Sequence, residues 1–366
     1  MRDFRARLRY LDEVIPLLYP AAAPGPAARR ASYAVVPSRL LPRRLVPRSR
    51  WLPGRRRLPA GAGTIEAYLS EVFGRRVRAT AHIRPARRAN RKPVLEVRGT
   101  DGGLLAFVKI GHTERSRALV RHEGATLDAL AGTPLKIVTP PAVLHHGVWN
   151  ELEVLALSPL PVPPVPLPVR LRLGRTSIPT SLLTRAVREI AALAPVAIPG
   201  TTASEDLLGD HLGRAALPVG AHAWPVTASR SADRHGAPPN TATASSWNHA
   251  WHGDFAPWNM AAAPDGRLLV WDWERFATGV PIGFDALHHS FQRALRRMPP
   301  PIAAQACLAQ SARTLEPFAV PAHQARSTAL HYLITLADRH EQDGHHPLGP
   351  PSEWLTPLAD RQEALL

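Results

Sequence analysis

A proline-rich tract divides the sequence into two parts of different character. Six of the ten residues from 159 to 168 are prolines. Proline fixes its own backbone angle and has no amide hydrogen, so this tract favours extended backbone and cannot continue a helix. We therefore expect a boundary between two structural units at this point of the chain.

The part before the tract has the pattern of a small sheet with one helix. Short apolar runs separated by turn signals predict strands at 77–84, 94–98, 104–110, 143–146 and 152–157. Between the third and fourth of these strands, apolar residues recur at helical spacing over 115–130 and predict a helix. This order is typical of a compact β-rich lobe.

The part after the tract changes to helical patterns. Amphipathic or apolar segments predict helices at 180–194, 301–317, 322–340 and 353–364. The predicted fold class is therefore α+β. We expect a basic, proline-rich extension of unknown role at 1–76, a β-rich lobe at 77–160 and a larger helical lobe at 161–366. The extension contains one predicted helix, 64–73, with Thr64 as its cap.

The chain is strongly basic, with a net charge of +16. Its basic residues are 42 arginines and only 3 lysines, and asparagine occurs only 5 times. Such a bias favours a compositional origin for most of the charge, on a solvated surface. A lysine or an asparagine at a chemically suitable position is less easily explained by this bias, and so carries more weight.

Cysteine content and hydropathy indicate the cellular compartment in which the protein is expected. Cys307 is the single cysteine, which excludes an internal disulfide and a cysteine-based zinc site. No apolar run is long enough to cross a bilayer, and the N-terminus lacks the pattern of a signal peptide. We expect a cytoplasmic protein without a membrane span.

The strongest chemical signal lies between Trp251 and Glu274. Asp254 is followed five residues later by Asn259, and then by a turn and an apolar strand that ends at Asp272. A hairpin would fold Asp272 back toward Asn259, so that a carboxylate and an amide oxygen face one point. Oxygen ligands of this kind suit magnesium, and the remaining carboxylate of Asp254 could orient or deprotonate an attacking hydroxyl.

This segment resembles the catalytic loop of the aminoglycoside phosphotransferase and choline-kinase-like families, which share the protein-kinase-like two-lobed fold. Residues 252–254 with Asn259 are similar to that loop, and residues 270–274 are similar to the metal-binding segment that replaces the Asp-Phe-Gly motif. The resemblance implies that Asp254 is the catalytic base, that Asn259 and Asp272 are magnesium ligands, and that His252 is a structural support of the loop.

The resemblance extends upstream and covers about residues 95–340. Lys109, in an apolar strand, and Glu123, on the apolar face of the next helix, resemble the Lys–Glu ion pair that orients nucleotide phosphates. An exposed edge strand would be the ordinary alternative for Lys109, and a solvated helix face for Glu123. Ser158 and Leu160 fall where the family binds the adenine ring with backbone groups.

Two features leave alternatives open. Asp285 could hydrogen-bond the catalytic loop or cap its own helix. No glycine-rich loop separates the first two predicted strands. That turn instead carries Arg87, Arg88, Arg91 and Lys92. These side chains could contact phosphate in place of backbone amides, or they could form an exposed basic turn.

The resemblance implies a magnesium-dependent phosphotransferase that moves the γ-phosphate of ATP or GTP to a hydroxyl of a small molecule. The net positive charge favours a neutral or anionic acceptor, such as a sugar or glycan precursor, over a polycationic one. One alternative is a catalytically weak nucleotide-binding regulator on a kinase fold, but all the reacting groups are present. The other is a basic nucleic-acid-binding protein. The sequence has no recognised motif for this role, and we do not expect a nucleic-acid partner.

Overall fold

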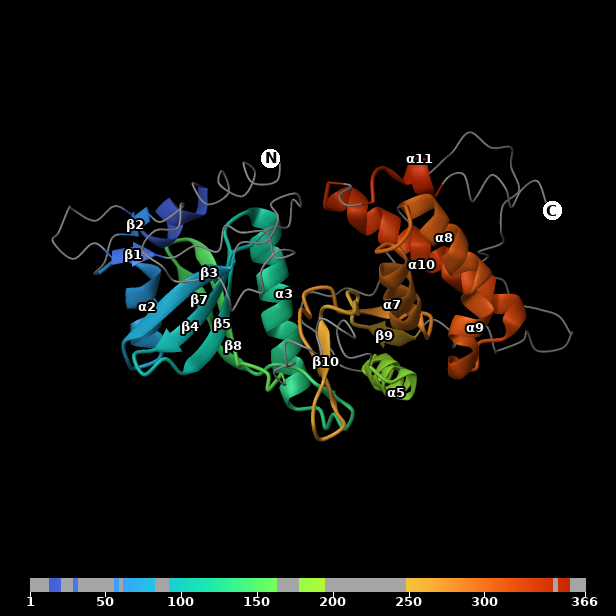
Figure 1. Cartoon of the computed structure of the whole chain (residues 1–366), viewed down its shortest axis with the longest axis horizontal. Helices are drawn as coiled ribbons and strands as arrows, with labels where there is room; N and C mark the ends of the chain where they lie inside the picture. The colour runs from blue at the N-terminus through green and yellow to red at the C-terminus, as the bar shows by residue number, and fades with distance from the viewer. Residues whose placement is uncertain are drawn as a thin grey trace, which may run out of the picture.

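The computed structural model describes residues 13–20, 29–31, 56–58, 62–82, 92–162, 178–194, 248–344 and 348–355. Most of the proline-rich tract lies outside the described residues, as do Arg87, Arg88 and Arg91. Within those residues an antiparallel sheet occupies the N-terminal part and helices dominate the C-terminal part, as Figure 1 shows. The fold class is therefore α+β, as predicted.

The N-terminal lobe is built on a five-stranded antiparallel sheet with the order β3-β4-β5-β8-β7. Its strands are β3 (Val77–His82), β4 (Val94–Gly99), β5 (Leu104–Gly111), β7 (Val143–Trp149) and β8 (Leu152–Leu157). All five were predicted from the apolar runs. The middle strand, β5, pairs with both β4 and β8, so its side chains are enclosed by neighbours on either side.

Two helices cover this sheet, and both begin at a threonine cap. In α2 (Ile65–Val72), Thr64 Oγ1 accepts a hydrogen bond from the amide of Ala67 at 3.2 Å, as predicted. In α3 (Glu114–Ala131), Thr113 and Ser116 form a reciprocal capping box. In Figure 1, α3 stands between the sheet and the C-terminal part of the chain, so its buried face can reach both.

Three further groups of short strands lie outside the five-stranded sheet, and one of them joins the two parts of the molecule. The β10–β11 hairpin (Met260–Ala262 and Leu268–Val270) is extended by β6 (Val138–Thr139), which runs parallel to β11. A second pair is β9 (His249–Trp251) with β12 (Ala277–Val280). A third, β1 (Arg29–Ala31) with β2 (Arg56–Leu58), lies near the N-terminus. The sequence patterns did not predict β6, β9 or β12, which are only two to four residues long.

The C-terminal lobe is mainly helical. Its helices are α5 (Thr180–Ala191), α7 (Phe284–Ala294), α8 (Pro300–Ala309), α9 (Ser311–Leu315), the 3-10 turn η2 (Glu316–Phe318), α10 (Ala322–Gln342) and α11 (Pro351–Trp354). The single helix predicted over 301–317 is interrupted at Gln310, where α8 ends. The predicted helix at 353–364 falls mostly outside the described residues.

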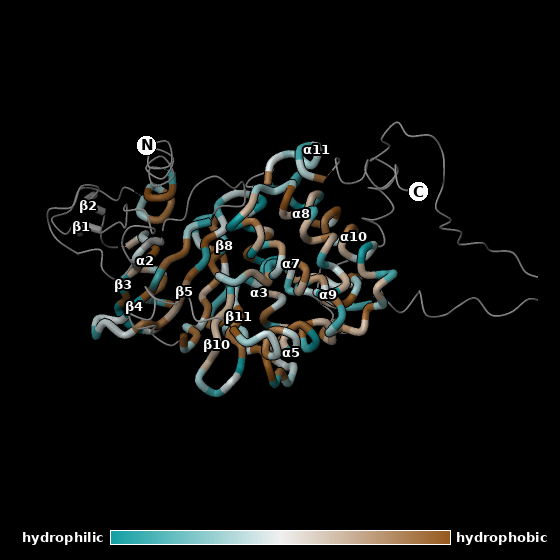
Figure 2. Tube along the Cα trace, turned by 45° about the vertical axis from the view of Figure 1, so that its right-hand side comes forward, coloured by the Kyte–Doolittle hydropathy of each residue, from teal (hydrophilic) through white to brown (hydrophobic). Residues whose placement is uncertain are grey.

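The buried apolar side chains form two hydrophobic cores, and the larger one also includes residues of α3 and β8. The N-terminal core joins the sheet to α2, and it also includes Val14 and Leu18 from a helical segment at residues 13–18. The larger C-terminal core centres on α7, α8 and α10. Figure 2 shows the apolar stretches along the sheet strands and within these helices. Parts of the N-terminal extension thus pack on the sheet, and its predicted boundary after residue 76 stays a prediction.

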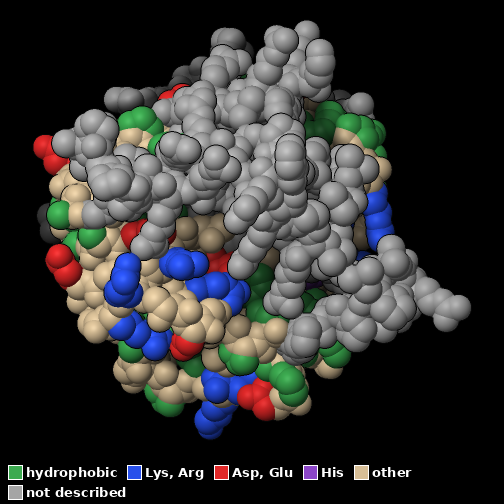
Figure 3. Space-filling model, turned by 60° about the vertical axis from the view of Figure 1, so that its left-hand side comes forward, with side chains coloured by type: hydrophobic (Ala, Val, Ile, Leu, Met, Phe, Trp, Pro, Cys, Tyr) green, Lys and Arg blue, Asp and Glu red, His purple; other side chains and the backbone are tan. Residues whose placement is uncertain are grey.

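Charged side chains are distributed unevenly over the surface. On the face drawn in Figure 3, Lys and Arg side chains lie in several separate groups with Asp and Glu side chains near them. Among the described residues, none of the helices combines the length and apolar character that crossing a bilayer requires.

Candidate functional site

Lys109 lies in the centre of the N-terminal sheet with its ammonium group paired. Its Nζ donates to Glu123 Oε1 and Oε2, both at 2.6 Å, and to Asp272 Oδ1. Only 7% of Lys109 is exposed, and Glu123 is fully buried. Because β5 is a middle strand and this face of α3 is buried, neither the exposed edge strand nor the solvated helix face applies.

Electrostatics keep Lys109 charged. Burial alone would lower the pKa of its ammonium group, but the charges and hydrogen bonds of Asp272 and Glu123 outweigh burial and raise the pKa. The amine is therefore a permanent cation within a group of carboxylates. A buried cation of this kind is stable only while its acidic partners remain in place.

Glu123 also connects α3 to the segment that follows β11. Its Oε1 accepts a hydrogen bond from the backbone amide of Trp273 at 3.1 Å. The neighbouring Asp272 adopts a left-handed backbone conformation with φ 73°, which Asp and Asn tolerate better than most residues. Strained backbone of this type is often found where a side chain must be aimed at a functional point.

The predicted hairpin brings the loop residues together. Asn259 Nδ2 donates to Asp254 Oδ2 at 2.8 Å and to the Asp254 carbonyl at 3.0 Å. The backbone amide of Trp271 donates to the carbonyl of Asn259 at 3.0 Å, which continues the β10–β11 ladder by one step. Asp272 therefore follows directly after the residue that pairs with Asn259, and the three predicted residues share one region.

Gly253 is required by the conformation of the loop. It has φ 77°, and a Cβ atom added to it would lie 2.0 Å from the carbonyl oxygen of Arg275. No side chain fits at that distance, so the glycine lets the two backbone segments approach each other. The close approach fixes the direction in which the chain leaves toward Asp254.

Asp285 holds the same loop from α7. Its carboxylate accepts hydrogen bonds from the backbone amides of His252 at 2.7 Å and Gly253 at 3.3 Å. The N-cap of α7 is Gly283, without a side-chain cap. Of the two roles considered for Asp285, the structure therefore has the loop contact. Burial raises its pKa to about 7, although both backbone hydrogen bonds oppose the change.

His252 is buried within the loop. Its Nδ1 accepts a hydrogen bond from the backbone amide of Asp254 at 3.2 Å, and its ring packs edge-on against Trp273, with centroids 4.7 Å apart. Burial lowers its pKa to about 4, so the imidazole is neutral near pH 7. These contacts support the backbone of the loop.

Two side chains behind Asp254 were not predicted. His288 Nε2 lies 3.1 Å from Asp254 Oδ1, and His288 Nδ1 lies 3.1 Å from the hydroxyl of Tyr332. Both residues are fully buried, on α7 and α10. The sequence offers no signal that joins positions this far apart, and the His288-His289 pair by itself resembles many structural histidines.

The predicted adenine-binding segment is partly committed to the sheet. Ser158 donates its backbone amide to the carbonyl of Ala142 at 2.9 Å, and its Oγ accepts from the amide of Ala142 at 2.8 Å. The carbonyl of Leu160 accepts from the amide of Val162 at 2.7 Å. A purine bound here would therefore have to use other backbone groups of this segment, among them the Leu160 amide.

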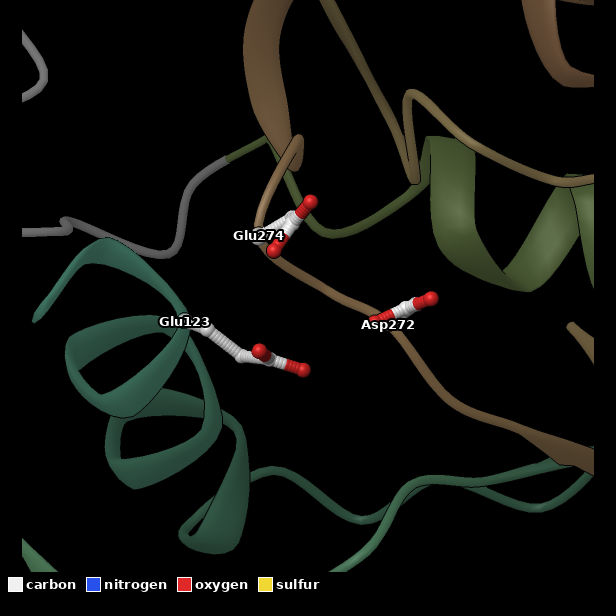
Figure 4. A group of neighbouring side chains, drawn as sticks. All are labelled: Glu123, Asp272 and Glu274. Atoms are coloured by element: carbon white, nitrogen blue, oxygen red, sulfur yellow. The ribbon is translucent and has the colours of Figure 1, made fainter. Parts of the chain in front are cut away.

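Three carboxylates gather beside Lys109. The side chains of Glu123, Asp272 and Glu274 each offer an oxygen within 4.8 Å of the others, as Figure 4 illustrates. Lys109 contacts both oxygens of Glu123 but only Oδ1 of Asp272, and Lys92 contacts Oε2 of Glu274. Asp272 and Glu274 are therefore the better placed for a metal. Asn259 commits its amide nitrogen to Asp254, which leaves its oxygen for that purpose. This oxygen-only set fits magnesium.

A lysine on the third strand of a sheet, paired with a glutamate on the following helix, is also found in protein kinases. No protein-family model and no curated protein matches the sequence. Among solved structures, the chain is similar to a candidate fructosamine-3-kinase from Haemophilus somnus 129PT, with 12% identity and a TM-score of 0.38 over 75% of this chain and 88% of that one.

Two structures of WbdD are also similar. One is described as monomeric and the other as a complex with the kinase inhibitor LY294002. Each is 14% identical to this chain, with TM-scores of 0.30 and 0.32 over 65% and 72% of it. The similar region spans 44% and 47% of the WbdD chains, which is less than half their length.

Proposed function

We propose that this protein is a magnesium-dependent phosphotransferase that moves the γ-phosphate of ATP or GTP to a hydroxyl group of a small molecule. The observation that carries the proposal is the buried contact of Lys109 with both Glu123 and Asp272, next to the Asp254–Asn259 pair. Phosphoryl transfer needs a cation for the phosphates, oxygen ligands for a metal and a carboxylate for the acceptor hydroxyl. These side chains include one candidate for each role.

Asp254 is proposed to accept the hydrogen bond of the acceptor hydroxyl. Burial would raise its pKa, but the hydrogen bond and charge of His288, with the charge of Arg339, hold the pKa well below its usual range. The carboxylate is therefore ionised and ready to accept. Its side chain is 26% exposed, so an acceptor can reach it. Such a weak base suits a loose transition state, in which the proton leaves the hydroxyl late.

Lys109 is proposed to bind the phosphates nearest the nucleoside, with Glu123 fixing the direction of its side chain. Asn259 and Asp272 are proposed to hold magnesium. When bound, this ion would neutralise negative charge on the phosphates. The backbone support comes from Asp285 and His252, whose contacts keep the Asp254 loop in one conformation. Catalysis would then consist of positioning and charge neutralisation.

The acceptor is proposed to be a neutral or anionic hydroxyl compound, such as a sugar or glycan precursor. The net charge of +16 is the feature that favours it over a polycationic acceptor. The proposed division of labour follows the predicted units, with the nucleotide held mainly by 77–160 and the acceptor by 161–366.

The direct test is a screen of acceptor pools for magnesium-dependent consumption of the γ-phosphate. With the active pool, Asp254→Asn should lower the rate of γ-phosphate consumption by at least about 100-fold, while nucleotide binding stays nearly intact. Asp272→Ala should abolish magnesium-dependent nucleotide binding. Asp265→Asn is the matched control, because Asp265 is an exposed turn residue of the same hairpin.

Two outcomes would contradict this proposal. The first is full turnover by Asp254→Asn, which would remove the proposed base. The second is a wild-type protein that binds no nucleotide in the presence of magnesium. Nucleotide binding without transfer to any acceptor would instead favour the regulator considered above.

A further inference from the structure

Lys92 is a second ammonium group at the candidate site, and its burial excludes for this residue the exposed basic turn considered above. It lies two residues before the start of β4, in the sequence between β3 and β4. Its Nζ pairs with Glu274, one of the three carboxylates shown in Figure 4. Only 8% of the Lys92 side chain and 13% of the Glu274 side chain are exposed. A buried ion pair therefore joins the N-terminal lobe to the segment after β11.

Sheet register directs Lys92 toward Lys109. Val94 and Lys109 are directly opposed on β4 and β5, and the amide of Ile110 donates to the carbonyl of Pro93 at 3.0 Å. Opposed residues share one face of a sheet, and so do residues two apart along a strand. Lys92, Val94 and Lys109 are therefore directed to the same side, where the carboxylates lie.

Lys92 has one direct carboxylate partner at this point, whereas Lys109 has two. Lys109 interacts directly with Glu123 and Asp272, which leaves Glu274 for Lys92. An added anion on this face of the sheet would stabilise the ammonium group.

Lys92 also lies in a segment of the sequence that lacks the glycines of a phosphate-binding loop. In kinases, the first hairpin covers the phosphates with the backbone amides of a glycine-rich loop. The segment 83–93 of this chain contains no glycine. A charged side chain near the end of this segment can provide the attraction for phosphate that the missing loop would provide.

We propose that Lys92 is a second phosphate-binding lysine of the nucleotide site, held by Glu274 while the site is empty and transferred to the polyphosphate when the nucleotide binds. This inference rests on the proposed function, because it requires the nucleotide to bind beside Lys109. It assigns to one side chain a role that backbone amides fill elsewhere. The ligand that Lys92 recognises is the polyphosphate of a nucleoside triphosphate, not its base or sugar.

The test compares the binding of ATP and of adenosine, each with magnesium, by calorimetry. Lys92→Met should weaken ATP binding by about tenfold or more, since a charge-assisted hydrogen bond is lost, and should leave adenosine binding within about twofold. Lys92→Arg, which keeps the cation, should retain most of the ATP affinity. Lys136→Met is the matched control, because Lys136 is an exposed lysine away from the site.

A second variant separates phosphate binding from the loss of the ion pair. Lys92→Met leaves Glu274 buried without its partner, which could by itself disturb the site. The double variant Lys92→Met/Glu274→Gln removes both charges, and it replaces the single variant if that one does not fold. We expect its ATP affinity to stay about tenfold low. Recovery to the wild-type affinity would overturn the proposal.

The result also separates this inference from the proposed function. A wild-type protein that binds ATP more tightly than adenosine, with a Lys92→Met variant that shows the same preference, contradicts only the role of Lys92. A wild-type protein that binds neither compound contradicts the nucleotide site as a whole, and with it the proposed function.

Discussion

Nε2 of His288 lies 3.1 Å from Oδ1 of Asp254, and this contact determines which ring nitrogen carries the proton. The ionised carboxylate of Asp254 can only accept hydrogen bonds, so Nε2 must be the donor. Nδ1 on the other side of the ring forms a hydrogen bond with the hydroxyl of Tyr332, 3.1 Å away. The His288 imidazole, placed between a buried tyrosine and Asp254, thus holds one oxygen of the proposed base.

We expect His288→Leu to lower kcat by about 10- to 100-fold, because Asp254 would lose its orientation toward the acceptor hydroxyl. KM for the nucleotide should stay within about twofold, since the contacts of Lys109 are unchanged. His288→Gln, which keeps a side-chain donor, should recover part of the loss. Tyr332→Phe should have an intermediate effect, because the ring would lose one of its two hydrogen bonds while the contact with Asp254 remains.

Steady-state kinetics on these variants checks this prediction, with His323→Leu as the control on an exposed face of α10. The orienting role requires kcat to fall while the folded fraction, followed by near-UV circular dichroism, is unchanged. Wild-type kcat in His288→Leu would contradict it. A parallel loss of kcat and folded protein would reduce His288 to a core residue.

The second prediction concerns the stability that Glu123 provides. Removing it leaves Lys109 with Asp272 alone and takes the acceptor away from the amide of Trp273. We expect Glu123→Ala to lower the free energy of unfolding by about 3 kcal/mol, the lower end for breaking a buried ion pair, because one partner remains. Asp128→Ala, on the exposed face of the same helix, should change it by less than about 0.5 kcal/mol. Urea denaturation measures both, and equal effects would contradict a special role for Glu123.

The sequence was sufficient to predict those strands and helices whose signal lies within one short segment of the chain. The apolar runs predicted every strand of the five-stranded sheet, and the position of Thr64 predicted the start of α2. The pairing of Lys109 with Glu123 could also be anticipated, because a charged group on an apolar face requires a partner of opposite charge. In each case one segment carries the information by itself.

The contacts that complete the site depend on distant segments. Tyr332 and His288 are 44 positions apart, and no periodicity relates them. The choice between the two roles of Asp285 depended on where α7 begins relative to the loop, and Gly283 rather than a side chain begins it. β6 has too few residues to show a periodic pattern in the sequence. Its pairing with β11 is what identifies it as a strand.

A third prediction tests the close approach at Gly253. Gly253→Ala places a methyl group where the Arg275 carbonyl lies, in addition to the strain of a positive φ. We expect it to lower the free energy of unfolding by about 3 kcal/mol or more. Gly266→Ala is a matched control, since Gly266 has φ +83° but nothing within 4 Å of an added Cβ. Gly266→Ala therefore measures the cost of backbone strain alone, and we expect it to lower the free energy of unfolding by about 1 to 2 kcal/mol. Equal effects of the two variants, measured by denaturation, would show that the contact with Arg275 does not matter.

The last prediction is a pH dependence that originates in His289. Burial, followed by the charges of Arg293 and His288, lowers its pKa to about 4. The unfolded chain, with the ordinary pKa near 6.5, therefore binds a proton that the folded chain does not bind between these pH values. The stability that neutral His289 provides is complete above about pH 6.5, and it is lost as the pH falls toward 4.

Only a comparison between variants isolates this group. His252 acts in the same direction, since burial lowers its pKa to about 4 as well. Asp285 acts in the opposite direction, because its pKa is raised to about 7 and the stability it provides is lost as the pH rises through that value.

For these reasons the quantity to measure is the difference in unfolding free energy between wild type and His289→Gln. Between pH 7 and pH 5 it should move by about 2 kcal/mol in favour of the variant. His323→Gln, at an exposed position, should show no such movement. A difference for His289→Gln that is the same at both pH values would mean that the imidazole has the same pKa in the folded and unfolded protein, which its burial against Phe255 and near Arg293 argues against.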